Sequence, residues 1–170
     1  MSTILLLVRH CHIDKIVIKS MGDDTPLTET GRKSALALAQ DQAVAEYIKG
    51  ASRFTILSDQ VLRCRQTVAP LHEKYQQSFF DTFESMESII RPVNELAEGE
   101  VVLICYRSEW VKEKKLHKLL GQVGSQIDRM RDEYSDSELS KKLSAAIYVF
   151  AFEQSAWVVK DPLPIPIDSI

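Results

Sequence analysis

Three short apolar segments of this chain are each followed by cationic or hydrogen-bonding side chains. In chain order, these side chains are Arg9 with His10, then Arg63, then Tyr106 with Arg107. Guanidinium groups match the oxygens of a phosphoryl group, and a neutral imidazole nitrogen can attack its phosphorus. If folding brings these side chains together, they could hold a phosphoryl group beside His10. Taken alone, Arg9 and His10 are more simply the first solvated residues after a core strand.

The segments that precede these side chains have the pattern of buried β-strands. Residues 4–8 and 101–105 are unbroken apolar runs rich in branched side chains, and residues 53–57 form a similar short segment. Such runs are typical of strands that are covered on both faces of a sheet. The carboxyl ends of adjacent parallel strands share one edge, where open α/β sheets bind ligands. The sequence therefore predicts that the three groups of side chains meet at that edge.

Helix signals separate the predicted strands. Thr28 is a suitable N-cap for a helix that ends at Gly50, and Ser108 begins another that Gly121 closes. A helix between them has an apolar stripe at three- and four-residue spacing, formed by Val61, Cys64, Val68, Leu71 and Tyr75. Arg63 lies in the first turn of this helix and off the stripe. It is therefore near a helix amino terminus, which favours a bound anion.

The remaining segments have weaker patterns. Residues 76–87 are expected to be irregular, and residues 88–98 could form a short helix. Residues 122–142 are highly polar and predict a helical excursion at the surface, which could shape a pocket mouth, offer a partner surface or simply be solvated. Residues 145–152 and 157–160 predict a hairpin at the edge of the sheet. The tail, residues 161–170, has three prolines and cannot be a central strand.

The alternation of these elements predicts an α/β fold, a three-layer α/β/α sandwich with a mainly parallel sheet. The 170 residues are expected to form a single domain, residues 1–170. A net charge of -3 gives no overall attraction to nucleic acid or to an anionic membrane. No apolar run approaches the roughly 20 residues of a membrane span. The first residues lack the features of a secretory signal, so a cytoplasmic location is expected.

The chain has three cysteines with no CxxC spacing. An odd number in a chain without a secretory signal argues against a disulfide framework. Each cysteine adjoins a residue of interest, since Cys11 follows His10, Cys64 follows Arg63 and Cys105 precedes Tyr106. A metal or redox cluster is conceivable, but small buried residues near the ends of strands and helices are the simpler interpretation.

Three motifs in the chain resemble those of the histidine phosphatase superfamily, which has the phosphoglycerate-mutase-like fold. They are Leu-Leu-Val-Arg-His at residues 6–10, Pro-Leu-Thr followed by Gly and Arg within residues 26–32, and Arg-Cys-Arg-Gln-Thr at residues 63–67. The compact length looks most like the small bacterial phosphohistidine phosphatases of the SixA type. The resemblance covers most of the chain, residues 4–152, and is weakest in the irregular middle segment and the polar excursion.

The resemblance implies a role for each matched residue. His10 would take the phosphoryl group as a phosphohistidine, and Arg9 and Arg63 would bind its oxygens. A carboxylate would protonate the leaving group, for which Glu84 is the candidate and Glu87 lies in the same region. The resemblance implies no metal and no organic cofactor. It implies a phosphorylated small molecule or a phosphoprotein as the partner.

The chain departs from the family pattern in the expected pocket. Cys11 replaces a glycine, and its Cβ could crowd the phosphate. Asp59 replaces a serine and would either repel phosphate or form an internal salt bridge with Arg9 or Arg63. The second phosphoryl-binding histidine of the family falls on Tyr106, which brings no positive charge near neutral pH.

Two functions therefore remain open. The first is a phosphatase with reduced activity that acts through His10 on a phosphomonoester or a protein phosphohistidine. The second is a catalytically inactive family member that binds a phosphorylated ligand or a protein partner. Arg107 could restore the missing charge, or could be a solvated residue at a helix start. The other histidines, His12, His72 and His117, do not obviously replace the missing one. The sequence does not predict the oligomeric state.

Overall fold

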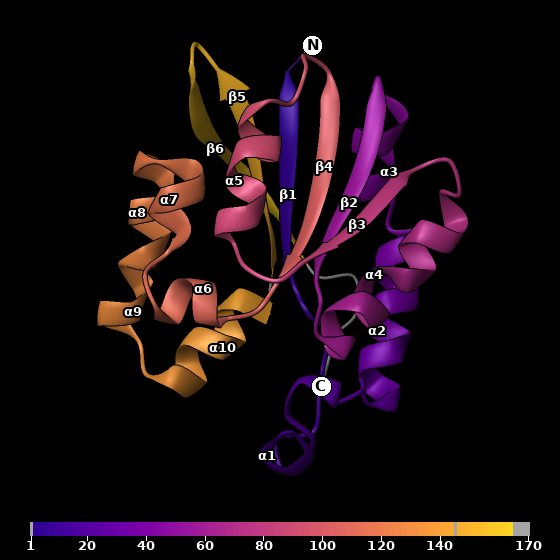
Figure 1. Ribbon diagram of the computed structural model, residues 1–170, viewed down its shortest axis with the longest axis vertical. Helices are drawn as coiled ribbons and strands as arrows, with labels where there is room; N and C mark the ends of the chain where they lie inside the picture. The colour runs from indigo at the N-terminus through magenta and orange to yellow at the C-terminus, as the bar shows by residue number, and fades with distance from the viewer. Residues whose placement is uncertain (1, 145, 165–170) are drawn as a thin grey trace.

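The computed structural model describes residues 2–144 and 146–164. Its centre is a six-stranded sheet in the order β3-β2-β4-β1-β5-β6. The strands are β1 (Thr3–Arg9), β2 (Arg53–Asp59), β3 (Phe79–Phe83), β4 (Glu100–Tyr106), β5 (Ala146–Glu153) and β6 (Ala156–Pro164). The pairings of β1 with β4, β4 with β2 and β2 with β3 are parallel, whereas β5 and β6 are antiparallel. The predicted mainly parallel α/β sandwich is confirmed (Figure 1).

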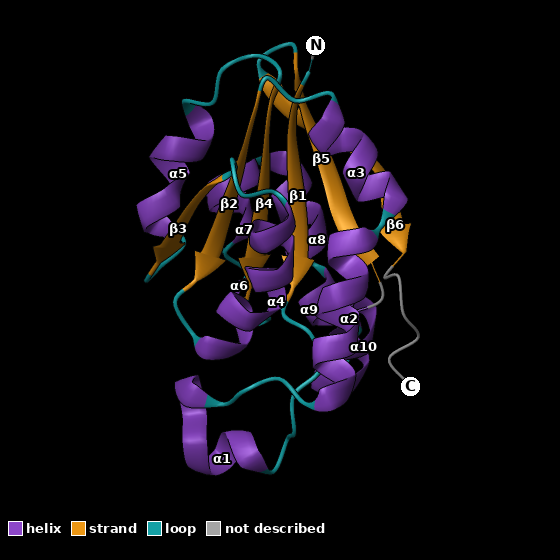
Figure 2. Cartoon of the chain, turned by 90° about the vertical axis from the view of Figure 1, so that its right-hand side faces the viewer, coloured by secondary structure: helices purple, strands orange, loops and turns teal. Residues whose placement is uncertain are grey.

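Helices cover both faces of the sheet. One face carries α2 (Glu29–Gln40), α3 (Gln42–Lys49) and α4 (Leu62–Lys74). The other face carries α5 (Glu87–Asn94), α6 (Glu109–Lys112), α7 (Leu116–Leu120), α8 (Gln122–Asp128), α9 (Met130–Glu133) and α10 (Asp136–Ser144). The short helix α1 (Val17–Met21) and the 3-10 turn η1 (Gly22–Asp24) project beyond the carboxyl edge of the sheet (Figure 2). None of the described helices is long and apolar enough to cross a membrane.

The central strand β1 shows why the sequence folds in this way. Leu5 and Leu7 point into the core on the α5–α10 side, whereas Leu6 and Val8 point into the core on the α2–α4 side. All four side chains are buried. Because successive residues of a strand point to opposite faces, a run without alternation fits only a strand that is covered twice. The strand predicted at residues 4–8 therefore becomes the middle of the fold.

Two expectations about the middle of the chain are wrong. Residues 76–87 were expected to be irregular, but they contain β3, which pairs in parallel with β2. As an edge strand with four of its five side chains at least partly exposed, β3 lacks the apolar pattern that marks β1 and β4. Residues 122–142 are helical as predicted, but they are not an excursion at the surface, because α8 and α10 bury Ile127 and Leu139 in the core.

Two predicted helices are each divided in the structure. The helix expected after Thr28 is interrupted at Asp41, whose extended backbone ends α2 and whose carboxylate accepts a 2.9 Å hydrogen bond from the Val44 N–H of α3. The helix expected between Ser108 and Gly121 is interrupted near Lys114, which has a φ of 53°. A lysine in the left-handed region ends regular helical bonding, so α6 and α7 are separate.

The hairpin predicted at the sheet edge is confirmed as β5 and β6, with Gln154 and Ser155 at its turn. The tail prediction holds for residues 161–164, which extend the edge strand β6. The rest of the predicted tail, residues 165–170, lies outside the described residues.

Candidate active site

The carboxyl ends of three parallel strands lie side by side. In the register of the sheet, Arg9 of β1 is opposite Tyr106 of β4, and Ser58 of β2 is opposite Cys105 of β4. The backbone N–H of His10 also reaches the Tyr106 carbonyl oxygen at 3.4 Å. The predicted adjacency of the strands is therefore correct, and Figure 2 shows them ending on the side where α1 lies.

His10 lies at this edge as a buried, neutral imidazole. Its side chain is 6% exposed, and its Nδ1 is 2.9 Å from the carbonyl oxygen of Cys11. Because a carbonyl oxygen only accepts hydrogen bonds, we assign the ring proton to Nδ1, which leaves the lone pair on Nε2. Burial holds the pKa of His10 well below its usual value, and the positive charges of Arg9, Arg63 and Arg107 lower it further. The ring therefore carries a free lone pair on Nε2 at neutral pH, which is the form of imidazole that can attack phosphorus.

Arg63 is a buried cation, and the described residues leave two of its donor atoms unpaired. It lies in the first turn of α4 and is 4% exposed. Its Nε and Nη1 atoms have no hydrogen-bond partner within residues 2–144 and 146–164. Thr67 links this helix to the site, because its hydroxyl donates to the Arg63 carbonyl oxygen at 2.7 Å and accepts from the Cys11 N–H at 2.9 Å. A buried guanidinium with unused donors is unfavourable unless an anion satisfies it.

Arg9 extends toward α10 rather than into bulk solvent. Its Nη1 donates to the Ser144 hydroxyl at 2.5 Å and to the Ser140 carbonyl oxygen at 3.2 Å. Its Nε is buried and has no partner among the described residues. Burial lowers the pKa of Arg9, and nearby Arg63 lowers it as well. An arginine starts from so high a pKa that it stays charged near neutral pH.

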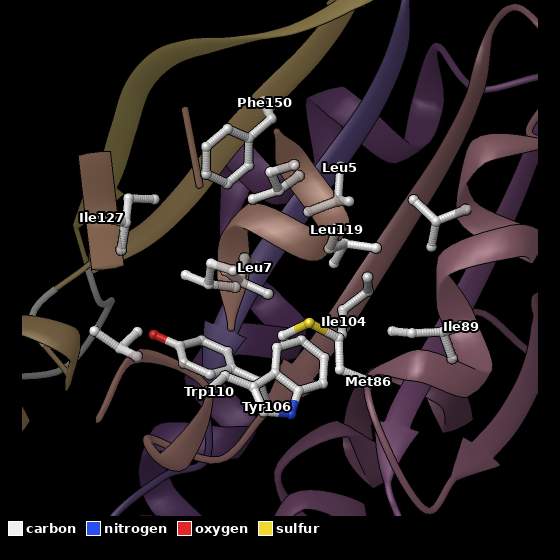
Figure 3. Packing of buried hydrophobic residues seen from close by; sticks show 14 of the residues in the cluster. Leu5, Leu7, Met86, Ile89, Ile104, Tyr106, Trp110, Leu119, Ile127 and Phe150 are labelled. Atoms are coloured by element: carbon white, nitrogen blue, oxygen red, sulfur yellow. The ribbon is translucent and has the colours of Figure 1, made fainter. Parts of the chain in front are cut away.

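Tyr106 lies in the hydrophobic core. Its ring is fully buried among Leu7, Met86 and Ile104, and it stacks on Trp110 with 5.8 Å between ring centroids (Figure 3). Its hydroxyl has no hydrogen-bond partner in the described part of the chain. Burial raises the pKa of this phenol, so it is neutral at physiological pH. The second phosphoryl-binding histidine of the family pattern is therefore replaced here by an uncharged side chain.

Asp59 pairs with Arg107, so the alternative in which it forms a salt bridge with Arg9 or Arg63 is wrong. Arg107 Nε donates to Asp59 Oδ2 at 3.0 Å, and Asp59 Oδ1 accepts from the Val61 N–H at 3.1 Å. β4 places Arg107 one residue beyond Tyr106, within reach of the end of β2. Arg63 is therefore left without a carboxylate partner in the part of the chain that the structure describes.

The Asp59–Arg107 ion pair is shielded from water on the aspartate side. Burial raises the pKa of Asp59, opposed by its bonds from the Val61 N–H and from Arg107. Burial alone would lower the pKa of Arg107, but Asp59 and Glu109 together raise it above its usual value. Arg107 also reaches Asp23 of η1 at 3.6 Å, so it links the sheet edge to the projecting segment.

A cavity of about 160 Å³ opens beside His10 between β1, α2 and α10. Its lining residues are Arg9, His10, Cys11, His12, Ile13, Lys15, Ser34, Ser140 and Ser144. This lining set contains two cations and no carboxylate. The Ser34 hydroxyl is buried without a partner among the described residues. In a chain of net charge -3, such a lining favours an anionic group.

The other residues singled out from the sequence lie further from the cavity or play structural parts. Glu84 is exposed in the turn after β3, and Glu87 forms an ion pair with Lys118 at 3.5 Å. His72 lies 2.9 Å from the Ser78 hydroxyl, and His117 lies 3.1 Å from Asp128. Neither histidine lines the cavity beside His10.

The three cysteines are free thiols, and Cys64 and Cys105 are fully buried. Burial raises the pKa of Cys11 to about 11, so it is a thiol at neutral pH. Its backbone is outside the left-handed region, so the glycine of the family pattern is replaced without strain in φ. Among residues 2–144 and 146–164, no cluster of side chains is arranged to hold a metal ion.

No pattern in the sequence pointed to the serines that line the cavity. Ser140 and Ser144 are four residues apart on α10, beside the buried pair Leu139 and Leu143. That apolar pair at helical spacing is the only pattern that could have shown α10 to be packed against the sheet. Nothing in the spacing of these residues points to contact with Arg9.

The fold and the side chains at its edge define an α/β protein with a cationic pocket around a neutral histidine. Residues 5–87 match the family model of the histidine phosphatase superfamily (branch 1). The resemblance predicted from the three motifs is thereby confirmed for this segment of the chain. No curated protein sequence matches the chain.

Several solved structures share the fold. SixA from Agrobacterium tumefaciens, whose assignment as a phosphohistidine phosphatase is provisional, has a TM-score of 0.65 at 18% identity and covers 96% of this chain and 98% of its own. A phosphoglycerate mutase from Plasmodium falciparum has a TM-score of 0.56 at 11% identity, over 95% and 90% of the two chains. A mycobacterial glucosyl-3-phosphoglycerate phosphatase has a TM-score of 0.55 at 14% identity, over 96% and 99%. At these identities the likeness establishes the phosphoglycerate-mutase-like fold.

Proposed function

We propose that this protein is a phosphatase that hydrolyses a phosphomonoester or a protein phosphohistidine through a phosphohistidine on His10, with reduced activity. The observation that supports this most is the buried Arg63, whose unused donors lie near a neutral imidazole with a free Nε2. An anion bound here would satisfy the guanidinium and bring phosphorus to the nucleophile. SixA and the glucosyl-3-phosphoglycerate phosphatase are named for phosphorylated substrates, which agrees with a phosphorylated ligand.

The reaction has two steps. In the first, Nε2 of His10 attacks phosphorus, the bond from phosphorus to the leaving-group oxygen or nitrogen breaks, and the leaving group takes a proton. In the second, water attacks the phosphohistidine, the P–N bond breaks, and His10 returns to its neutral form with release of inorganic phosphate. Arg9 and Arg63 neutralise the charge on the phosphoryl oxygens in both steps. The proposal requires no metal and no organic cofactor, so a chelator should leave turnover unchanged.

The proposal also needs a proton donor for the leaving group and a third cation beside Arg9 and Arg63. Glu84 is exposed near the carboxyl edge and is the proposed acid. Arg107, held at the edge by Asp59, is proposed to replace the positive charge that Tyr106 does not supply. The loss of one preorganised donor typically lowers a rate by roughly 10²–10³. The buried, neutral Tyr106 therefore accounts for the reduced activity in the proposal.

A second candidate function is an inactive family member that binds a phosphorylated small molecule or a phosphoprotein. The observations that favour it are the core position of Tyr106 and the engagement of Arg107 with Asp59. Both leave an anion pocket around His10 while weakening its catalytic power. A cytoplasmic location is part of either proposal, supported by an odd number of cysteines.

Hydrolysis of p-nitrophenyl phosphate separates the two candidates, with binding of inorganic phosphate or vanadate measured in parallel. Turnover that disappears in His10→Ala supports the phosphatase. Phosphate binding without turnover, followed by turnover in Tyr106→His, supports the inactive binding protein. Absence of both turnover and anion binding in the parent chain would contradict both candidates.

A further inference from the structure

The contacts of Arg9 single out α10 as part of the anion pocket. Both hydrogen bonds that the structure gives to the Arg9 side chain leave from Nη1, and both end on α10, at the Ser144 hydroxyl and the Ser140 carbonyl oxygen. The two N–H groups of Nη1 are therefore used. The buried Nε has no partner in the described part of the chain, so the edge of the guanidinium that includes Nε is the one left for a ligand.

α10 packs against the sheet through two buried side chains. Leu139 and Leu143 are fully buried in the core on the α5–α10 side of the sheet. Each is followed directly by a serine, Ser140 and Ser144. Both serines also line the cavity beside His10. α10 lies outside residues 5–87, the segment that matches the superfamily. The partners of Arg9 on α10 therefore come from the part of the chain that the family model does not match.

The hydroxyl of Ser144 has two uses in this arrangement. Its oxygen accepts the proton of Arg9 Nη1 at 2.5 Å, so its own proton must point elsewhere. Because Ser144 lines the cavity, that proton can be donated to an anion inside it. Without the hydroxyl, Arg9 would keep only the Ser140 carbonyl as an anchor. The side chain would then regain rotamer freedom that binding must remove.

We infer that Ser144 is a positioning residue for Arg9, which it fixes so that the Nε edge of the guanidinium faces a phosphoryl group bound at His10. This inference rests on the proposed function, because it presumes that the pocket binds a phosphoryl group or inorganic phosphate. It assigns to α10 a role that neither the sequence motifs nor the matched segment contains.

The test is the affinity of the full-length protein for inorganic phosphate and vanadate, measured by calorimetry for the parent and three variants. Ser144→Ala should weaken binding about tenfold, since hydrogen bonds to charged groups are among the stronger ones. Ser144→Thr keeps the hydroxyl and should stay within about twofold of the parent. Ser137→Ala, an exposed serine of the same helix, is the matched control and should not change binding. If the parent turns over substrate, KM should rise more than kcat falls in Ser144→Ala.

The outcomes distinguish this inference from the proposed function. Phosphate binding that is unchanged in Ser144→Ala, or equally weakened in Ser144→Thr, overturns the inference and leaves the phosphoryl pocket intact. A loss of folding in Ser144→Ala also overturns it, since Ser144 would then support α10 rather than Arg9. If the parent binds neither anion, the proposed function fails and the inference fails with it.

Discussion

At the scale of single residues, the three arginines of the candidate site differ in how many hydrogen-bond and ion-pair partners they have. Arg107 has two carboxylates, Arg9 has two oxygen acceptors on α10, and Arg63 has no side-chain partner among the described residues. Arg63, which has the fewest partners, is therefore also the most buried of the three arginines. An unpaired buried cation destabilises the folded protein, and groups that carry such a cost are typical of functional sites.

Arg63→Met should make the protein more stable and the pocket weaker. Methionine fills a similar volume without a buried charge, so the free energy of unfolding should rise by about 1–3 kcal/mol. Binding of inorganic phosphate should fall by at least about 100-fold, because a charge-assisted contact is lost. Chemical denaturation and calorimetry measure the two quantities.

Arg65→Met is the matched control, since Arg65 lies two residues along the same helix and is exposed. It should leave phosphate affinity unchanged. A destabilised Arg63→Met with unchanged phosphate affinity would show that Arg63 is structural.

The sequence could predict which residues reach the edge but not how they pair there. Arg9, His10 and Arg63 were recognised because each follows a segment with a readable pattern. The pairing of Asp59 with Arg107 depends on the register of β2 and β4, which the sequence does not encode locally. The core position of Tyr106 depends on the same register, because a strand residue faces whichever layer its pleat dictates.

At the scale of elements, the segment after β1 and the start of α2 are built as one unit. The Thr28 N–H donates to the His12 carbonyl oxygen at 3.1 Å, and the Thr28 hydroxyl caps Gly31 at 3.1 Å. Gly31 lets the helix pass close to this loop, because a Cβ built on it would lie 2.3 Å from the His12 carbonyl oxygen. The loop that holds His10 is therefore fixed by the first turn of a helix some 20 residues later.

Gly31→Ala should disturb the site through the backbone. The added methyl group meets a backbone atom that cannot rotate away, so either α2 or the loop at His12 must shift. The free energy of unfolding should fall by about 1–3 kcal/mol, as in other overpacked sites. Phosphate affinity should fall as well, because His10 is two residues from the displaced atom.

Gly50→Ala is the matched control for this substitution. Gly50 has an ordinary right-handed conformation, and a Cβ there would be 3.8 Å from its nearest neighbour. Stability should be unchanged or higher by about 0.4–1 kcal/mol. Equal behaviour of the two alanine variants would contradict the close approach at Gly31.

At the scale of the whole molecule, the strongly patterned elements were predictable and the weakly patterned ones were not. β1 and β4 are covered on both faces, so their composition alone identifies them. The edge strand β3 and the polar helices α8–α10 were misjudged, because each places only a few side chains in a core formed by distant segments. Long-range packing leaves little trace in local sequence, and the contact of Ser144 with Arg9 is of this kind.

The stability of the whole fold should depend on pH through His10. Its folded pKa is lowered well below 6.5, chiefly by burial, so the unfolded chain binds the proton first as the pH falls. The neutral imidazole therefore contributes stability that is fully present above about pH 6.5 and is lost as the pH falls toward the lowered value. The free energy of unfolding should decline between pH 7 and pH 5, by at most about 1.4 kcal/mol per pH unit from this group.

His10→Asn isolates that contribution, because asparagine cannot titrate and its amide can still donate to the Cys11 carbonyl oxygen. Asp59 has the opposite sign, since its raised pKa makes stability fall as the pH rises from about 3.8. Subtracting the two unfolding curves cancels Asp59 and every other group that both proteins share. Urea denaturation at several pH values should show a shallower slope in His10→Asn than in the parent. Identical slopes would mean that folding leaves the pKa of His10 unshifted, which would contradict the lowering of this pKa by burial.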